Sequence, residues 1–295
     1  MNLLTEYKKT LKLLEVEEIF DLFFYRPLAF AFVKLIYNTN ITPNQLTIVS
    51  LIFGLLGGAS YVLGTYSAYI AGAILYLLYN IFDCSDGQLA RLKNSGTPLG
   101  RIFDGFVDYV VSIALYFGIG LGFANNTDNP VLWWILTVIA GISNATHSIL
   151  LDFFRNRFLD YALSRESILD DGLEDFQNDY ENLKKQSGKI FEKIIIGTYI
   201  KYSSLQNKLT SGKKSTKKIK KFDATNYCKK NRILIHCWTY LGPTTQWTFL
   251  IVCSLLNRLD LYLLGIIFVL NFLLIIMYLI QIQIDHTITL ETEVK

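Results

Sequence analysis

The sequence predicts an all-α protein, an integral membrane bundle of six transmembrane helices preceded by N-terminal interfacial helices. The chain of 295 residues is 52% hydrophobic and has a mean hydropathy of +0.32, which is too apolar for an ordinary soluble domain. Its apolar residues gather into long spans and do not recur periodically. Aspartates stand at the edges of two spans, where a charge is costly unless function requires it.

Residues 1–37 are expected to form amphipathic helices that lie along the membrane interface. Charged residues interrupt their apolar pattern and no small-residue cleavage site follows, so the segment does not resemble a cleavable signal peptide. A soluble helical tail is an equal alternative for residues 1–18. The interface is favoured for residues 19–37, where an aromatic run follows Arg26.

Residues 38–157 are expected to contain the first four spans. No charged residue occurs in Leu35–Phe82, which is long enough for two spans of about 20 residues each. A turn is expected near Gly64, and Thr42 is a suitable N-cap for the first span. The third span is predicted from about residue 99 to 124. The fourth begins at an interfacial tryptophan pair, Trp133-Trp134, and runs to about residue 154.

Residues 158–231 are predicted to be a polar cytoplasmic insertion. Its first part is acidic, residues 190–209 resemble an amphipathic helix, and a lysine run follows at 213–221. A lysine run beside a membrane is attracted to anionic lipid, and a solvated loop is the equal alternative.

Residues 232–285 are predicted to hold spans five and six, in the charge-free stretches Ile233–Asn257 and Leu261–Ile284, and residues 286–295 form a C-terminal tail. Six crossings place both termini on the same face as the connection between spans two and three. Most loop lysines and arginines belong to that face, so the positive-inside rule makes it cytoplasmic.

Four carboxylates stand out at the edges of the second and third spans. Asp83 and Asp86 are three residues apart, and Asp104 and Asp108 are four apart, so each pair projects from one face of a helix. Two facing helices can therefore bring all four to one pocket, which would require cations. Oxygen ligands suit Mg²⁺ or Mn²⁺, and a cluster large enough for two ions indicates phosphoryl chemistry.

Small residues and one arginine separate the two carboxylate pairs. They are Gly87, Ala90, Arg91, Gly96 and Gly100. Small side chains allow a bulky ligand to approach the helix backbone, and Arg91 offers a fork for a phosphate.

The whole arrangement resembles the signature of the CDP-alcohol phosphotransferase family. That signature reads Asp, two residues, Asp-Gly, two residues, Ala-Arg, eight or nine residues, Gly, three residues, Asp, three residues, Asp. The matching positions here are Asp83, Asp86, Gly87, Ala90, Arg91, Gly100, Asp104 and Asp108. The Thr-Pro-Asn before the first span is also similar to this family, and the resemblance covers roughly residues 26–157 by motif.

The resemblance implies that a CDP-linked donor sits over two divalent ions, Mg²⁺ or Mn²⁺, with Asp108 as the base. Asp108 would take a proton from the acceptor hydroxyl, which attacks the distal phosphorus so that CMP leaves. The implied metal ligands are Asp83, Asp86 and Asp104, with Asp108 as a possible fourth. The implied nucleotide site is lined by Gly87, Ala90 and Gly100, with Arg91 and Thr97 beside them. A homodimer is also implied.

Arg155 and Arg157 follow the fourth predicted span, on the same side as the motif. They are candidates for binding a phosphate on the acceptor, and topological anchoring by positive charge is an equal alternative.

The sequence leaves the substrates open. The leading hypothesis is a CDP-diacylglycerol donor with a polar acceptor such as inositol phosphate, glycerol phosphate or serine, in phospholipid synthesis. An alternative is a soluble CDP-alcohol donor with a lipid or polyol acceptor. A remote alternative is a transporter with a metal site, but the span pattern has no internal repeat. Membrane lipids are expected as partners. No nucleic-acid partner is expected.

Overall fold

The computed structural model shows a chain built of helices, with no strand in the parts it describes. The described residues are 3–11, 13–163, 180–181, 193, 196–197, 200–201 and 223–293. Most of the predicted insertion, including the lysine run and most of the amphipathic segment at 190–209, therefore lies outside the described residues.

The helices are given in chain order, with short 3₁₀ or π segments marked η. The N-terminal half contains α1 (Leu3–Thr10), η1 (Leu14–Val16), η2 (Asp21–Tyr25), α2 (Arg26–Ile36), α3 (Pro43–Tyr61), α4 (Tyr66–Leu92), α5 (Pro98–Asn126) and α6 (Pro130–Ala162). The C-terminal part contains α9 (Ala224–Trp238), η3 (Thr239–Leu241), α10 (Pro243–Leu255), α11 (Leu259–Leu264), η4 (Gly265–Leu270) and α12 (Asn271–Glu293).

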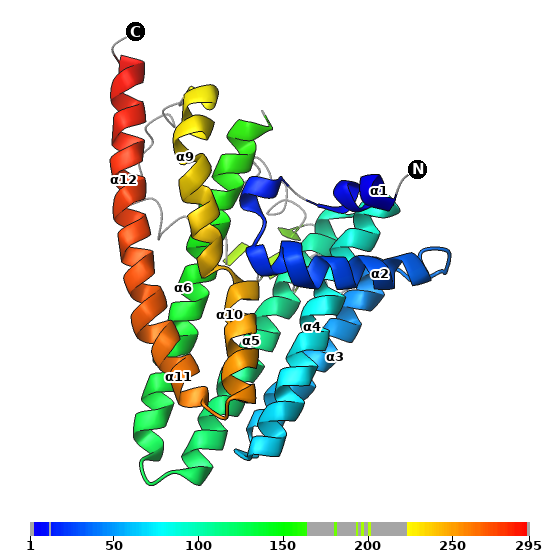
Figure 1. The fold of residues 1–295 in the computed structure, drawn as a ribbon, viewed down its shortest axis with the longest axis vertical. Coiled ribbons are helices and arrows are strands. Elements are labelled where there is room, and N and C mark those ends of the chain that lie inside the picture. Colours follow the sequence, from blue (N-terminus) through cyan, green and yellow to red (C-terminus); the bar gives the residue numbers. More distant parts are fainter. Residues whose placement is uncertain are drawn as a thin grey trace.

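The long helices run side by side along the length of the molecule, and α2 runs across them (Figure 1). The α5–α6 and α10–α11 connections lie at one end of the bundle, and both chain termini lie toward the other. Within the described parts of the chain, four helical stretches are long and apolar enough to cross a membrane. They are Tyr66–Leu92, Leu99–Asn126, Pro130–Ala162 and Leu259–Ile288.

Threonine caps begin the three helices that carry the motif and its support. Thr42 forms a reciprocal capping box with Gln45 at the start of α3, which confirms the predicted cap. Thr65 accepts a hydrogen bond from the backbone N–H of Ala68 at the start of α4, and Thr97 does the same for α5. Each cap satisfies a backbone donor that would otherwise have no partner in the first helical turn.

Helix α3 packs closely against both α4 and α5, because small residues line the contact. A Cβ atom on Gly118 of α5 would collide with the carbonyl oxygen of Gly58 on α3. Only glycine allows the two backbones to approach this closely. The apolar cluster around Tyr76, Val111 and Tyr262 then holds α4, α5 and α11 together.

Helix α6 continues about two turns beyond the predicted end of the fourth span. The extra turns are stabilised by Phe158 and Leu159, which are buried in a second cluster with Tyr227 and Trp238 of α9. Burial of these apolar side chains favours the helix beyond the point where the membrane-spanning composition ends.

The predicted fifth span is not one uninterrupted helix. Residues Ile233–Asn257 comprise the end of α9, the 3₁₀ turn η3 and the helix α10. The break falls at Gly242, which is extended with φ −69° and ψ 158°, and Pro243 begins α10. Proline has no backbone N–H and is disfavoured inside a helix but suits the first helical position, so the Gly-Pro pair divides the stretch.

Candidate active site

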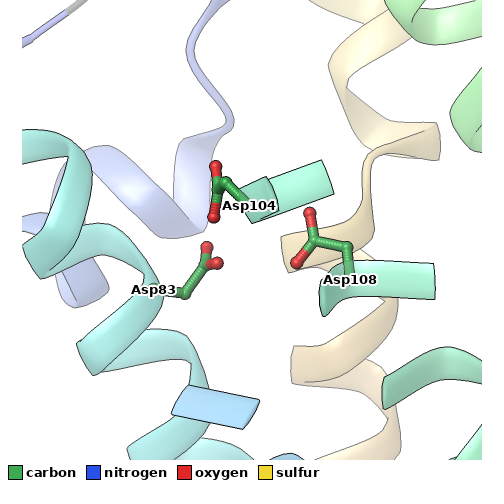
Figure 2. A group of neighbouring side chains, drawn as sticks. All are labelled: Asp83, Asp104 and Asp108. Atoms are coloured by element: carbon green, nitrogen blue, oxygen red, sulfur yellow. The ribbon is translucent and has the colours of Figure 1, made fainter. Parts of the chain in front are cut away.

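Three aspartates from two helices form a compact group of carboxylates. One carboxylate oxygen each from Asp83, Asp104 and Asp108 lies within 4.8 Å of the others. Asp83 belongs to α4, while Asp104 and Asp108 stand one turn apart on α5, and Figure 2 shows the three side chains pointing toward a shared space. This convergence of two motif halves on one point agrees with the spacing argument for helices.

The donor set of this group fits a hard divalent cation. All three side chains offer carboxylate oxygens, which suit Mg²⁺ or Mn²⁺. The Oδ1 atom of Asp83 is buried and has no hydrogen-bond partner among the described residues. Three carboxylates this close repel one another unless cations or protons neutralise them. The residues present therefore fit the ion binding that the sequence suggests.

Asp86, the fourth predicted ligand, lies outside this group of three. Its Oδ2 accepts a hydrogen bond of 2.5 Å from the hydroxyl of Thr47 on α3. Both side chains are buried. The third helix thus takes part in the site, because α3 carries a residue that fixes one of the motif carboxylates.

Tyr79 is a residue of the site that the sequence motif does not contain. Its hydroxyl donates a hydrogen bond of 2.6 Å to Oδ1 of Asp108. Tyr79 precedes Asp83 by four residues and so shares its helix face. That spacing was the available signal, but buried tyrosines are common in apolar helices and the spacing alone does not identify a partner on α5.

The predicted nucleotide residues lie at the end of α4 and the start of α5, and several of their polar atoms form hydrogen bonds within the protein. Arg91 donates from Nε to the carbonyl oxygen of Thr10, at 2.5 Å, and its guanidinium lies beside Gly87, 3.3 Å from where a Cβ would stand. The hydroxyl of Thr97 accepts a hydrogen bond of 3.0 Å from the backbone N–H of Gly100. The carbonyl oxygen of Ala90, the remaining predicted nucleotide residue, accepts a hydrogen bond from the backbone N–H of Ser95.

Arg155 and Arg157 both make ion pairs inside the protein. Arg155 lies 3.6 Å from Oε1 of Glu18, and its Nε is buried without a hydrogen-bond partner among the described residues. Arg157 donates to Asp285 of α12 at 2.8 Å and lies over the ring of Tyr227 at 5.1 Å. These contacts give both arginines a role in holding α6 to its neighbours.

A second group of buried charges lies beside the site, in the segment before α2 and at the first residue of that helix. Arg26 pairs with Glu17 at 2.8 Å and with Asp21 at 3.8 Å, and Cys84, next to Asp83 in sequence, donates to Asp21. Burial raises the pKa of Asp21 above its usual value. The sequence prediction assigned this segment to the interface and did not foresee its buried charges.

A comparison with known protein families matches the segment of the chain that carries the motif. The sequence model of the CDP-alcohol phosphatidyltransferase family matches residues 40–158, which include every position of the motif. Residues 40–158 therefore match a CDP-alcohol phosphatidyltransferase domain. The domain comprises α3, α4, α5 and nearly all of α6, so it contains the three-carboxylate group together with Thr47 and Tyr79.

Three curated relatives are similar to part of this chain. Phosphatidylinositol phosphate synthase of Corynebacterium glutamicum is 32% identical over 103 residues, covering 35% of this chain and 41% of the relative. Archaetidylinositol phosphate synthase of Pyrococcus horikoshii is 36% identical over 89 residues, covering 30% and 46%. The bifunctional IPC transferase and DIPP synthase of Thermococcus kodakarensis is 31% identical over 121 residues, covering 40% and 26%. The chain spans less than half the length of each.

Proposed function

We propose that this protein transfers a phospho-alcohol group from a CDP-alcohol to an acceptor hydroxyl and releases CMP, with two divalent ions, as a step of phospholipid synthesis. The observation that carries the proposal is the convergence of Asp83, Asp104 and Asp108 within 4.8 Å, inside a domain of the matching family. Grouped carboxylates of this kind are suited to hold ions at a diphosphate.

Each carboxylate has its own part in the proposed reaction. Asp83 and Asp104 hold metal, with Asp86, fixed by Thr47, completing the ligand set. Bound Mg²⁺ or Mn²⁺ supplies charge neutralisation at the diphosphate of the donor. Asp108 accepts the proton of the acceptor hydroxyl as its oxygen bonds to the distal phosphorus and the bond from that phosphorus to CMP breaks.

The surrounding residues of the motif bind the donor. Gly87, Ala90 and Gly100 allow the nucleotide to approach the helix backbones, and Arg91 presents its guanidinium over Gly87. Thr97 fixes the first turn of α5 through its bond to Gly100, which sets the helix on which Asp104 and Asp108 stand.

The donor and acceptor are proposed as CDP-diacylglycerol and a phosphorylated inositol. The printed names of two relatives, a phosphatidylinositol phosphate synthase and an archaetidylinositol phosphate synthase, favour an inositol phosphate among the polar acceptors. Arg155 or Arg157 would meet the phosphate of the acceptor by exchanging part of its present ion pairing with Glu18 or Asp285.

The membrane arrangement is proposed to comprise six crossings. Helix α3, with 19 residues, and α10 with the adjoining end of α9 add two crossings to the four apolar helical stretches. Helix α2 then lies at the interface, which its course across the bundle supports (Figure 1). The active site faces the cytoplasm, and the protein works as a homodimer.

The direct experiment measures CMP release by purified protein in detergent, with a panel of CDP-alcohol donors and hydroxyl acceptors. We expect release with CDP-diacylglycerol and inositol phosphate, loss of activity with excess chelator, and recovery on addition of Mg²⁺ or Mn²⁺. Asp83→Asn should be inactive, while Asp128→Asn, which changes an exposed carboxylate in the α5–α6 connection, should behave as wild type. Full activity in excess chelator would contradict the two-metal proposal.

A further inference from the structure

The hydrogen bond between Tyr79 and Asp108 joins the two motif helices at the site of proton transfer. The tyrosine hydroxyl donates to Oδ1 of Asp108 at 2.6 Å. Tyr79 is 1% exposed, so water does not compete for its hydroxyl. A hydrogen bond to a charged acceptor in such surroundings is stronger than one between neutral groups.

Aromatic packing fixes the ring of Tyr79 in place. Trp247 of α10 contacts the ring edge to face, with 5.3 Å between ring centroids. Tyr76, one turn earlier on α4, contacts it in the same manner at 6.1 Å. Because buried rings packed on two sides have little freedom to rotate, the position of the hydroxyl is set before any ligand binds.

A fixed donor at Oδ1 restricts how the carboxylate of Asp108 can turn. Asp108 stands opposite Asp83 and beside Asp104 (Figure 2), and each of these offers an oxygen within 4.8 Å of the others. The terminal bond of the Asp108 side chain has a broad torsional preference, and the bond from Tyr79 favours one orientation of the carboxylate. General-base catalysis requires the accepting oxygen to be within reach of the hydroxyl proton.

We propose that Tyr79 is the positioning residue for Asp108, holding its carboxylate in the orientation needed to accept the proton of the acceptor hydroxyl. The inference rests on the proposed function and deepens it. On this proposal Tyr79 acts through Asp108, to which it donates its hydrogen bond, and has no part in binding the donor or the acceptor. Its loss should therefore slow turnover while the binding of metal and nucleotide persists.

The chain provides a closely matched control in Tyr76. This residue is also buried in α4 and stacks on the same Trp247, with 5.0 Å between ring centroids. Its hydroxyl, however, has no hydrogen-bond partner among the described residues. Tyr76→Phe and Tyr79→Phe thus each remove one buried hydroxyl from the same aromatic cluster, and only the second removes a contact to the site.

The experiment compares wild type, Tyr79→Phe and Tyr76→Phe for CMP release, and measures binding of Mn²⁺ and of CDP by calorimetry without acceptor. We expect kcat of Tyr79→Phe to fall about 10- to 100-fold, the usual range for losing one hydrogen bond to a charged group. KM for the donor, CDP affinity and Mn²⁺ affinity should stay within about threefold. Tyr76→Phe should retain kcat within about twofold.

A double variant separates positioning from general packing. If Tyr79 acts only through Asp108, adding Tyr79→Phe to Asp108→Asn should leave the residual rate unchanged, because interacting residues are not additive. Full kcat in Tyr79→Phe, equal loss in both tyrosine variants, or additive losses in the double variant would each overturn the inference. Wild-type protein that releases no CMP from any donor would instead contradict the proposed function, so the two failures are distinguishable.

Discussion

The carboxylate of Glu18 accepts a hydrogen bond from the backbone N–H of Thr245, 227 residues later in the chain, at 3.0 Å. Thr245 is the third residue of α10, so Glu18 satisfies a backbone donor of the first helical turn that its own helix cannot. Through this contact the segment before α2 is anchored to the helix that supports Tyr79.

The charge state of Glu18 should make stability depend on pH. Burial raises the pKa of Glu18 from 4.5 to about 8, repulsion from Asp21 acts in the same direction, and Arg155 opposes both. Between these pH values the folded protein holds a proton that the unfolded chain has lost, so stability falls as pH rises. Glu18→Gln keeps an oxygen acceptor but does not titrate. The melting temperature of Glu18→Gln minus that of wild type, both measured in detergent, should therefore be larger at pH 8 than at pH 5. A constant difference would contradict this assignment.

Gly242 provides the space for that carboxylate. A Cβ at this position would collide with the carboxylate of Glu18. Gly242→Ala should therefore displace Glu18 and lower stability by about 1–3 kcal/mol, as overpacking generally does. Thermal unfolding measures the effect. Gly105→Ala is the control, because nothing lies within 4 Å of a Cβ there, and an equal loss in both variants would rule out the proposed collision.

Thr47 should matter for function through its hydroxyl. Thr47→Val preserves the shape of the side chain but removes the donor to Asp86, which leaves a buried carboxylate oxygen without its partner. We expect donor affinity to fall about 10-fold or more, with Thr47→Ser close to wild type because it keeps the hydroxyl. Calorimetry with CDP and Mn²⁺ checks this. If Thr47→Val keeps wild-type affinity while Thr47→Ser loses it, the methyl group and not the hydrogen bond is what the site requires.

Arg157 allows a structural role to be separated from acceptor binding. If its main task is the ion pair with Asp285, Arg157→Gln and Asp285→Asn should lower the melting temperature by similar amounts, and the double variant should be little worse than either. If Arg157 also binds an acceptor phosphate, Arg157→Gln should raise KM for the acceptor and leave KM for the donor unchanged, while Asp285→Asn should change neither. Equal KM values in both single variants would restrict Arg157 to stabilising the fold.

Substitutions of different motif carboxylates should have different effects on metal binding, donor binding and turnover. Asp83→Asn should weaken Mn²⁺ and donor binding together, since Asp83 offers a buried oxygen with no protein partner among the described residues. Asp108→Asn should reduce kcat about 100-fold or more while donor binding persists, because the amide cannot accept the proton. CMP release and calorimetry on the same preparations distinguish the two. Loss of Mn²⁺ binding in Asp108→Asn to the same extent as in Asp83→Asn would identify Asp108 as a ligand instead of a base.

The sequence by itself determined the helical class, the position of the motif and the start of the helices that carry it. Caps such as Thr42 act within a few residues of the chain, and apolar spans are visible from composition, so both can be recognised locally. The i,i+4 spacing of Asp104 and Asp108 likewise placed both on one face of α5, where the structure has them.

Only the tertiary structure decided how the four aspartates divide and what holds them. Asp86 lies outside the group of the other three and accepts a hydrogen bond from Thr47 on α3, and Asp108 accepts one from Tyr79 on α4. The buried pairing of Glu18 with Thr245 joins the two ends of the chain in the same way. Such contacts depend on which helices pack together and at what distance, and the close approach of Gly58 and Gly118 sets that distance for α3 and α5. Local patterns do not encode it, because any polar side chain on a buried face can find its partner on several neighbours.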